Sequence, residues 1–168
     1  MKYLIILFLF ASLSSCWPTR VSFIDGTMPE EWKTFSVKTL DNNAPNTPIS
    51  YAAQLSEKLK DGIQNNTRLL LDPETGKGEI YLEGVISSYS VTPVAIQEGD
   101  NSAKNRLTVS VQFTIFVSAP EEDKIILTST RFVDYDSNVD LATQENSLLE
   151  EVSTQIVQDV INKLLSNW

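Results

Sequence analysis

A single cysteine stands at a position where a lipid could be attached to the chain. Met1 and Lys2 supply positive charge, an apolar run over residues 3–13 follows, and two serines precede Cys16. A basic start, a short apolar run and small residues are typical of a signal peptide. Small residues before a cysteine are typical of the bacterial lipoprotein box, so we expect Cys16 to carry diacylglycerol and an N-acyl chain such as palmitate. Two acyl signals suffice for stable anchoring. The alternative is a buried cysteine in a core helix, where a free thiol packs as a small hydrophobe.

A run of oxygen-bearing side chains has the spacing of a calcium-binding loop. Alternate side chains of such a loop converge on the cation through oxygen ligands. Its first, third, fifth, seventh and twelfth positions would be Asp134, Asp136, Asn138, Asp140 and Glu145. The sixth position, where a sharp turn favours glycine, is Val139. The alternative is a strand end, a turn built by Asp and Asn side chains, and the start of a helix. We expect no resident metal and no cofactor.

Three cations are candidates for binding an anion such as a lipid phosphate. The chain has 13 Lys and Arg against 22 Asp and Glu, so a cluster of cations would stand out. Lys104 and Arg106 end a polar loop, residues 90–106, and long loops between strands are often functional. Arg131 shares its strand parity with apolar neighbours. Charged donors bind phosphate strongly. The alternative for either arginine is an ion pair with a nearby carboxylate.

Composition argues against catalysis and against nucleic acid. The chain has no histidine and one cysteine, which excludes Ser-His-Asp and Cys-His arrangements as well as an intramolecular disulfide. Its adjacent glutamates at 121–122 and 150–151 lie in a predicted hairpin tip and on a predicted solvated helix face. A formal net charge of −9 disfavours contact with nucleic acid. We therefore expect a binding or structural module without catalytic residues.

Hydrophobic periodicity outlines the elements that must position these side chains. Alternating apolar residues predict half-buried strands, and recurrence every three to four residues predicts helices. The clearest alternation runs over residues 106–118, where the apolar positions are odd-numbered. Thr47 and Pro48 resemble an N-cap followed by proline at the first helical position. The patterns predict strands over residues 33–40, 79–91, 106–118 and 124–135, and helices over 48–64 and 143–168.

This order, β-α-β-β-β-α, predicts an α+β fold. Each helix has one apolar stripe and the sheet has at least one apolar face. The economical arrangement is a four-stranded, mainly antiparallel sheet with both helices packed on one face. We expect residues 1–15 to be a signal peptide, 16–31 a lipidated tether and 32–168 a single domain.

Several segments, in order, resemble the LptE family, the outer-membrane lipoprotein of the lipopolysaccharide transport machinery of Gram-negative bacteria. They are TFSVKTLDNNAP (34–45), EGVISSYSVTPVAIQ (83–97), AKNRLTVSVQF (103–113), RFVDYD (131–136) and NKLLSNW (162–168). One departure is Trp17, where a small residue commonly follows the lipidated cysteine in the family.

The resemblance implies a role that is not enzymatic. A member of this family would plug the LptD β-barrel, help it to assemble and assist delivery of lipopolysaccharide to the cell surface. The implied partners are the LptD-like barrel and lipopolysaccharide. The implied location is the periplasmic side of the outer membrane, held by the lipid anchor. Lys104, Arg106 and Arg131 are lipopolysaccharide-binding candidates on physical grounds only. The rival interpretation is a periplasmic lipoprotein that binds a small ligand or scaffolds another envelope complex.

Overall fold

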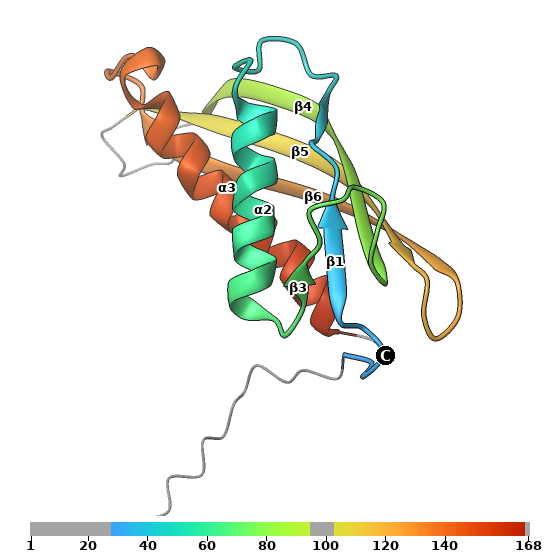
Figure 1. Ribbon diagram of the computed structural model, residues 1–168. Coiled ribbons are helices and arrows are strands. Elements are labelled where there is room, and N and C mark those ends of the chain that lie inside the picture. The colour runs from blue at the N-terminus through green and yellow to red at the C-terminus, as the bar shows by residue number, and fades with distance from the viewer. Residues whose placement is uncertain (1–27, 95–102, 167–168) are drawn as a thin grey trace, which may run out of the picture.

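Two helices lie on one face of a twisted sheet, and within the described part of the chain no helix lies on the other face (Figure 1). The computed structural model describes residues 28–94 and 103–166. The strand order across the sheet is β3-β1-β4-β5-β6, and a sixth short strand, β2, pairs with β4. The predicted α+β class and the two helices on one face are confirmed. The predicted number of four strands is wrong.

Three long strands form the antiparallel part of the sheet. They are β4 (Ile80–Val94), β5 (Lys104–Val117) and β6 (Asp123–Asp136), which pair in the order of the chain. The predicted loop over residues 90–106 is therefore shorter than expected, because both of its ends continue the ladder between β4 and β5. Its centre, residues 95–102, lies outside the described residues.

Three short strands add parallel pairings, so the sheet is mixed. β1 (Thr34–Val37) lies parallel to both β4 and β3 (Leu70–Leu71), and β2 (Asp41–Asn42) lies parallel to β4. Parallel neighbours need a crossover connection, and helix α2 (Tyr51–Asn66) supplies it between β1 and β3. The sequence hid β2 and β3 because each has only two residues, one pair polar and the other exposed.

The alternating pattern of β5 builds the core. Its odd-numbered residues from 107 to 117 are all buried, and they meet apolar side chains of both helices. Strand β4 follows the same rule only in part, because the register shifts between Ile86 and Ser88. This irregularity reverses the parity of the strand, as a β-bulge does. Tyr89 therefore lies on the helix side, although strict alternation from Ile80 would place it on the opposite face.

Both helices turn an apolar stripe toward the sheet. Helix α2 begins at Tyr51, after an N-cap at Ser50, so the predicted cap at Thr47 is wrong. The Thr47 hydroxyl instead donates to the Ala44 carbonyl, within the preceding turn. Helix α3 (Leu141–Leu165) starts where Asp140 accepts a hydrogen bond from the Ala142 amide. Neither helix is apolar enough over sufficient length to cross a membrane, among the residues described.

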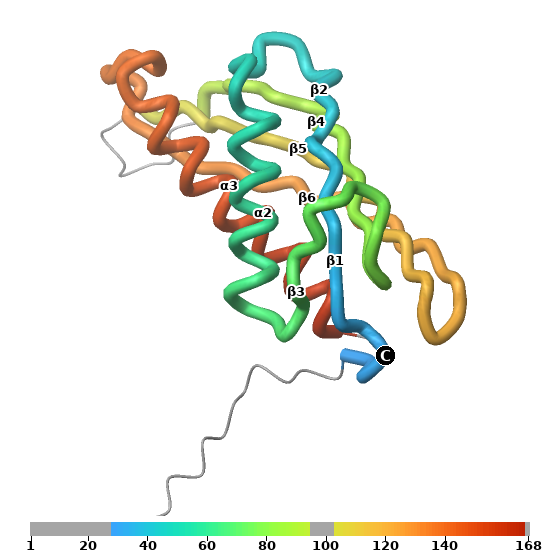
Figure 2. The backbone as a smooth tube through the Cα atoms, viewed as in Figure 1, coloured from blue at the N-terminus to red at the C-terminus, as the bar shows by residue number. Residues whose placement is uncertain are grey.

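The segment that leads into the sheet is fixed by a tryptophan. Trp32 is fully buried, and its indole N–H donates to the carbonyl of Ala119, 2.6 Å away in the hairpin between β5 and β6. The guanidinium of Arg68 donates to the carbonyl of Met28, 2.9 Å away, and also to that of Pro29. Residues 28–32 are thus joined both to this hairpin and to the end of α2. The tube in Figure 2 shows this segment entering beside β1.

Candidate functional site

The face of the sheet opposite the two helices is a candidate surface for a partner. We call it the open face. It is formed by side chains of β4, β5 and β6 that alternate with the core residues, and register places them in seven rows. The middle rows carry hydroxyl and amide groups beside Val85 and Ile126, whereas each end of the face brings aromatic rings and cations close together. The rows are Tyr81–Phe116–Lys124, Glu83–Thr114–Ile126, Val85–Gln112–Thr128, Ser88–Ser110–Thr130, Ser90–Thr108–Phe132, Thr92–Arg106–Asp134 and Val94–Lys104–Asp136.

Arg106 occupies one end of the open face within a compact polar cluster. Its guanidinium donates to both carboxylate oxygens of Asp134, with Nε to Oδ1 at 2.6 Å and Nη2 to Oδ2 at 2.9 Å. The same guanidinium lies 3.7 Å from the ring centroid of Phe132, a cation–π distance. This hydrogen bonding holds the pKa of Asp134 below its usual range and raises that of Arg106. The ion-pair alternative for Arg106 is confirmed.

Lys104 lies beside this cluster, at the start of β5. Its backbone pairs with Asp136, and its charge contributes, after the hydrogen bond from Arg106, to the lowered pKa of Asp134. Two of the three predicted anion-binding residues, Lys104 and Arg106, are therefore brought together. Phe132, 47% exposed, adds an apolar surface next to them. Such a combination can meet a charged headgroup and a neighbouring acyl chain.

Arg131 lies on the opposite side of the sheet, toward α3. Its Nε donates to Oδ2 of Asp159 at 2.7 Å, and a second guanidinium nitrogen bonds the other carboxylate oxygen. The buried hydroxyl of Ser129 also donates to this carboxylate, at 2.5 Å. The bond from Arg131 is the main reason that the pKa of Asp159 is lowered. Arg131 is thus separated from Lys104 and Arg106 and joins β6 to α3.

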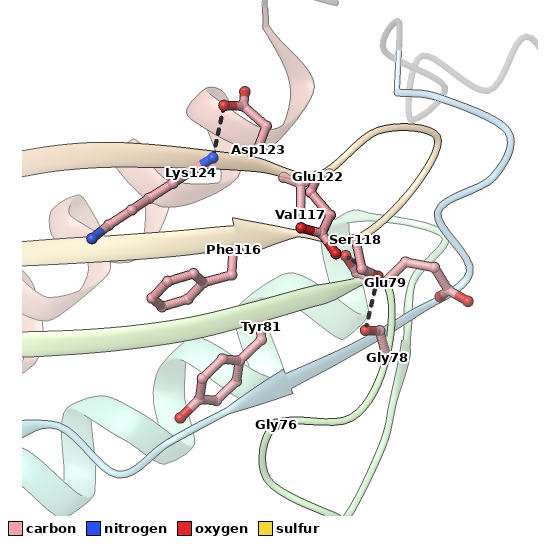
Figure 3. Close-up of a pocket in the computed structure, with 10 residues that line it drawn as sticks. All are labelled: Gly76, Gly78, Glu79, Tyr81, Phe116, Val117, Ser118, Glu122, Asp123 and Lys124. Atoms are coloured by element: carbon pink, nitrogen blue, oxygen red, sulfur yellow. Dashed lines mark hydrogen bonds between the residues drawn. The ribbon is translucent and has the colours of Figure 1, made fainter.

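The other end of the open face is hollowed into a shallow pocket of about 620 Å³ (Figure 3). Tyr81 and Phe116 form its floor as stacked rings whose centroids are 5.7 Å apart. The ammonium of Lys124 lies 5.4 Å from the Phe116 ring centroid. Figure 3 shows both rings on the same side of the sheet, with the hairpin that carries Glu122 beside them. This pocket can offer a stacking surface next to charged groups.

The acidic wall of the pocket has a structural role. One oxygen of Glu79 accepts from the Thr34 amide at 2.7 Å and from the Thr34 hydroxyl at 2.9 Å. These bonds to β1, foremost the one from the amide, lower the pKa of Glu79. Glycine is required close by, because Gly78 has φ +95° and a Cβ there would lie 2.9 Å from Thr34 Oγ1. Glu79 therefore fixes the edge of the pocket.

The structure does not bring the five calcium candidates together. Asp134 binds Arg106, and Asp136 accepts from the Asn138 amide and side chain. Asp140 caps α3, while Glu145 accepts from the hydroxyl of Tyr89. Within residues 28–94 and 103–166, no group of three or more acidic, Cys or His side chains is placed to hold a metal ion. The geometry matches the alternative of a strand end, a turn and a helix start.

Two tyrosines of β4 and β6 belong to the core and not to the exposed surface. Tyr89 and Tyr135 are 9% and 7% exposed. Burial is the main cause, and the hydrogen bond to Glu145 a further one, of the raised pKa of Tyr89. The exposed aromatic surface instead comes from Phe132, Tyr81 and Phe116, which sequence reasoning did not select. Phe116 and Phe132 are even-numbered, whereas the buried apolar positions of their strands are odd-numbered. This difference in the sequence could have identified them as exposed.

The predicted lipid attachment site lies outside the described residues. Cys16 belongs to residues 1–27, and the tether of residues 16–31 is described only from Met28 onward. Lipidation of Cys16 and the signal peptide therefore stay predictions.

Comparison with known families gives a match over most of the described chain. The family model LptE, described as lipopolysaccharide-assembly, matches residues 32–164. No curated protein matches the sequence. The match spans β1 to almost the end of α3 and thus includes the open face.

Solved structures share the fold at low sequence identity. A protein from Chlamydia trachomatis is 12% identical with a TM-score of 0.55, and the alignment covers 81% of this chain and 99% of that one. A homolog of neuraminyllactose-binding hemagglutinin from Helicobacter pylori is 7% identical with a TM-score of 0.56, covering 81% and 84%. A protein from Xanthomonas campestris is 12% identical with a TM-score of 0.52, covering 82% and 86%. These likenesses concern the fold alone.

Proposed function

The chain belongs to the LptE lipopolysaccharide-assembly family, and from this premise we propose that it is a non-enzymatic lipoprotein that plugs and helps to assemble an LptD-like β-barrel. In this role it assists delivery of lipopolysaccharide to the cell surface. The observation that carries the proposal is the family match over residues 32–164. The lipoprotein box at Cys16 supports it from the sequence.

The open face gives the proposal a physical basis. The lumen of an outer-membrane barrel is polar, so a plug needs a surface that can exchange hydrogen bonds with it. The middle rows of the open face carry hydroxyl and amide groups, among them Gln112, Thr128 and Ser110. The helix side is less suited, because the space between helices and sheet is filled by buried apolar side chains. We therefore place the barrel contact on the open face.

Copurification tests the barrel role. The full chain, extracted in detergent from its native membranes, should bring down a large outer-membrane barrel in a constant ratio. Depletion of the chain should lower the amount of that barrel and of surface lipopolysaccharide. Unchanged barrel and lipopolysaccharide levels after depletion would refute the proposed function.

The anchor is tested at Cys16. Cys16→Ala should abolish incorporation of labelled fatty acid, because the thioether cannot form without the thiol. The chain should then leave the membrane fraction, since two acyl chains provide stable anchoring. Ser15→Ala keeps a small residue before the cysteine and serves as the control. Continued labelling of the Cys16→Ala chain would contradict the lipoprotein box.

The Lys104–Arg106 cluster is the proposed contact for lipid A phosphates. Changing both residues to Glu should weaken binding of lipopolysaccharide to the purified chain, because the cluster turns from cationic to acidic. Lys60→Glu is the control, since Lys60 lies on α2 in an ion pair with Glu57. Equal lipopolysaccharide binding by the charge-reversed and native chains would remove this site.

A further inference from the structure

The loop that joins β2 to α2 presents an isoleucine that is almost fully exposed. We call residues 43–50 the entry loop. The side chain of Ile49 is 99% exposed, more than any other large hydrophobic residue in the described part of the chain. A single exposed hydrophobic residue is ordinary on a protein surface. The backbone, the helix start and the charge around Ile49 therefore decide whether it has a role.

The backbone of the entry loop is held in one shape. At its start the Asn43 amide donates to a carbonyl of β4, 3.0 Å away. At its end the Tyr51 amide donates to the Pro48 carbonyl, also at 3.0 Å, which places Ile49 at the corner of a tight turn. Between them Asn46 has a φ of 63°, a conformation that asparagine tolerates better than most residues. The loop therefore presents Ile49 on a preformed backbone.

The start of α2 does not explain an isoleucine at this position. A hydrophobic residue just before an N-cap often packs against the fourth residue of the helix and fixes its entry. With Ser50 as the N-cap, the fourth residue is Gln54, whose side-chain amide donates to the Ser50 hydroxyl at 3.3 Å. The helix start is held by Tyr51 instead, which is buried and bonded to Ser153 of α3. Truncation of Ile49 should therefore leave the fold intact.

The sequence around Ile49 carries no charge. Charged residues make up 21% of the chain, yet none occurs from Asn42 to Ser56. Depletion of charged residues distinguishes the core of a protein interface from the rest of a protein surface. Insertion into a membrane surface fits less well, because segments that lie there typically combine cations with several large apolar side chains. The entry loop has no cation and no large apolar side chain besides Ile49, so a protein partner is favoured.

We propose that Ile49 is a knob that fills an apolar, uncharged socket on the barrel partner. The inference rests on the proposed function and extends its contact beyond the open face, because the entry loop follows β2, where Asp41 pairs with Val85. Figure 1 shows the loop at the end of the molecule opposite to the segment (blue) that leads into β1. Helix α2 has 16 residues and is ~24 Å long, close to the ~25 Å height of a barrel's apolar band. The socket therefore lies near the end of the lumen away from the N-terminal side of the fold.

Competition in the native membranes tests the knob. A tagged variant and the untagged native chain are produced in equal amounts, and the barrel that copurifies with the tag is measured. Ile49→Ala should bring down roughly tenfold less barrel than tagged native chain, because loss of a buried apolar side chain weakens binding by about that factor. Ile49→Val keeps most of the knob and should bring down nearly as much as native chain.

Two controls separate the knob from a general loss of apolar surface or of folding. Leu70→Ala is a matched truncation at a 65% exposed site on β3, and it should not weaken copurification. The purified Ile49→Ala chain should melt at the same temperature as native protein, because Ile49 makes no core contact.

Cross-linking then identifies what covers the knob. An aliphatic diazirine amino acid of similar size at position 49 should join the chain to the barrel on irradiation. If native chain brings down no barrel at all, the proposed function is lost and the knob with it. If native chain and Ile49→Ala bring down the barrel equally, the function stands and the knob is overturned. The knob is also overturned if Leu70→Ala loses as much barrel as Ile49→Ala, or if the diazirine labels lipid and not the barrel.

Discussion

The arginines of this chain show how an acidic protein uses its few cations. Arg106 and Arg131 both bind a carboxylate through two nitrogens, one on each side of the sheet. An anionic ligand at Arg106 must therefore compete with Asp134 for the guanidinium. Lys104 beside it adds a second positive charge near Asp134, and the proposed binding of a phosphate relies on both cations.

The pair between Arg131 and Asp159 leads to a prediction about acid stability. The pKa of Asp159 is lowered in the folded chain, so its contribution is present above its unfolded pKa of about 3.9 and is lost as pH falls through the folded pKa. Asp159→Asn should lower the free energy of unfolding by about 1 kcal/mol at neutral pH, a modest value because solvent screens the partly exposed Arg131. Urea unfolding should show this difference shrinking below about pH 4.

Glu122→Gln provides the control for this experiment. It removes one negative charge from an exposed position in the β5–β6 hairpin, without touching the Asp159 cluster. The difference in unfolding free energy between Asp159→Asn and native protein could stay constant from neutral to strongly acidic pH. That result would contradict the stabilising role of the Asp159 carboxylate.

At the scale of elements, the close approach of the two helices depends on one glycine. A Cβ on Gly62 of α2 would lie 2.3 Å from Cγ1 of Val157 on α3. Real side chains do not approach so closely, so the helices must separate or Val157 must move. Gly62 does not have a positive φ, so its role is to leave space for α3.

Gly62→Ala should destabilise the fold, although alanine is the better helix former. The gain in helix propensity is about 1 kcal/mol, whereas overpacking a core costs about 1–3 kcal/mol. We expect a net loss of about 1 kcal/mol in the free energy of unfolding, measured with urea. Asn65→Ala, at an exposed site of the same helix, should not destabilise. Val157→Ala should remove part of the loss when combined with Gly62→Ala, and strictly additive losses would contradict the clash.

The long elements could be predicted from periodicity, and the irregular ones could not. Strand β5 follows its alternating pattern over its whole length, and α3 follows the helical stripe, because each buries one regular face. Strict alternation along β4 would place Tyr89 on the wrong face, because a register shift after Ile86 changes parity without any local signal in the sequence. Strands of two residues, such as β2, are defined by the neighbour they pair with. The bond between Arg131 and Asp159 likewise depends on tertiary packing.

At the scale of the whole molecule, three tyrosines make the fold sensitive to alkaline pH. Burial raises the pKa of Tyr51 and of Tyr81 to about 12, and raises that of Tyr89 as well. The folded chain therefore keeps these protons at a pH where the unfolded chain loses them. Each raised pKa contributes stability that is fully present below the unfolded pKa of about 10. This contribution decreases as pH rises through the folded pKa.

Tyr51→Phe should make the melting temperature less dependent on pH above about 10. Ser153→Ala is the matched control: it removes the hydrogen bond between the two hydroxyls, 3.1 Å long in the native fold, but keeps the ionisable phenol. The control should lower the melting temperature at neutral pH and keep or steepen the alkaline slope, because the bond from Ser153 lowers the pKa of Tyr51. Equal alkaline slopes for native protein and Tyr51→Phe would show that Tyr51 does not contribute.

Sequence patterns do not predict the order of the strands in the whole sheet. Periodicity shows that β1 is a strand, but its position between β3 and β4 depends on contacts across more than thirty residues. The aromatic and cationic side chains at the two ends of the open face share this origin. Tyr81, Phe116 and Lys124 come from three strands, and only their register brings them side by side.

Trp32 has a mechanical consequence for the fold. Force applied at Met28 from the N-terminal side reaches the indole of Trp32, which is buried and bonded to the β5–β6 hairpin, only after two carbonyls held by Arg68. The bonds from Arg68 to the carbonyls of Met28 and Pro29 carry part of the same force to the end of α2. A pull from the N-terminal side is therefore divided between sheet and helix before it reaches β1, and the core is shielded from peeling strand by strand.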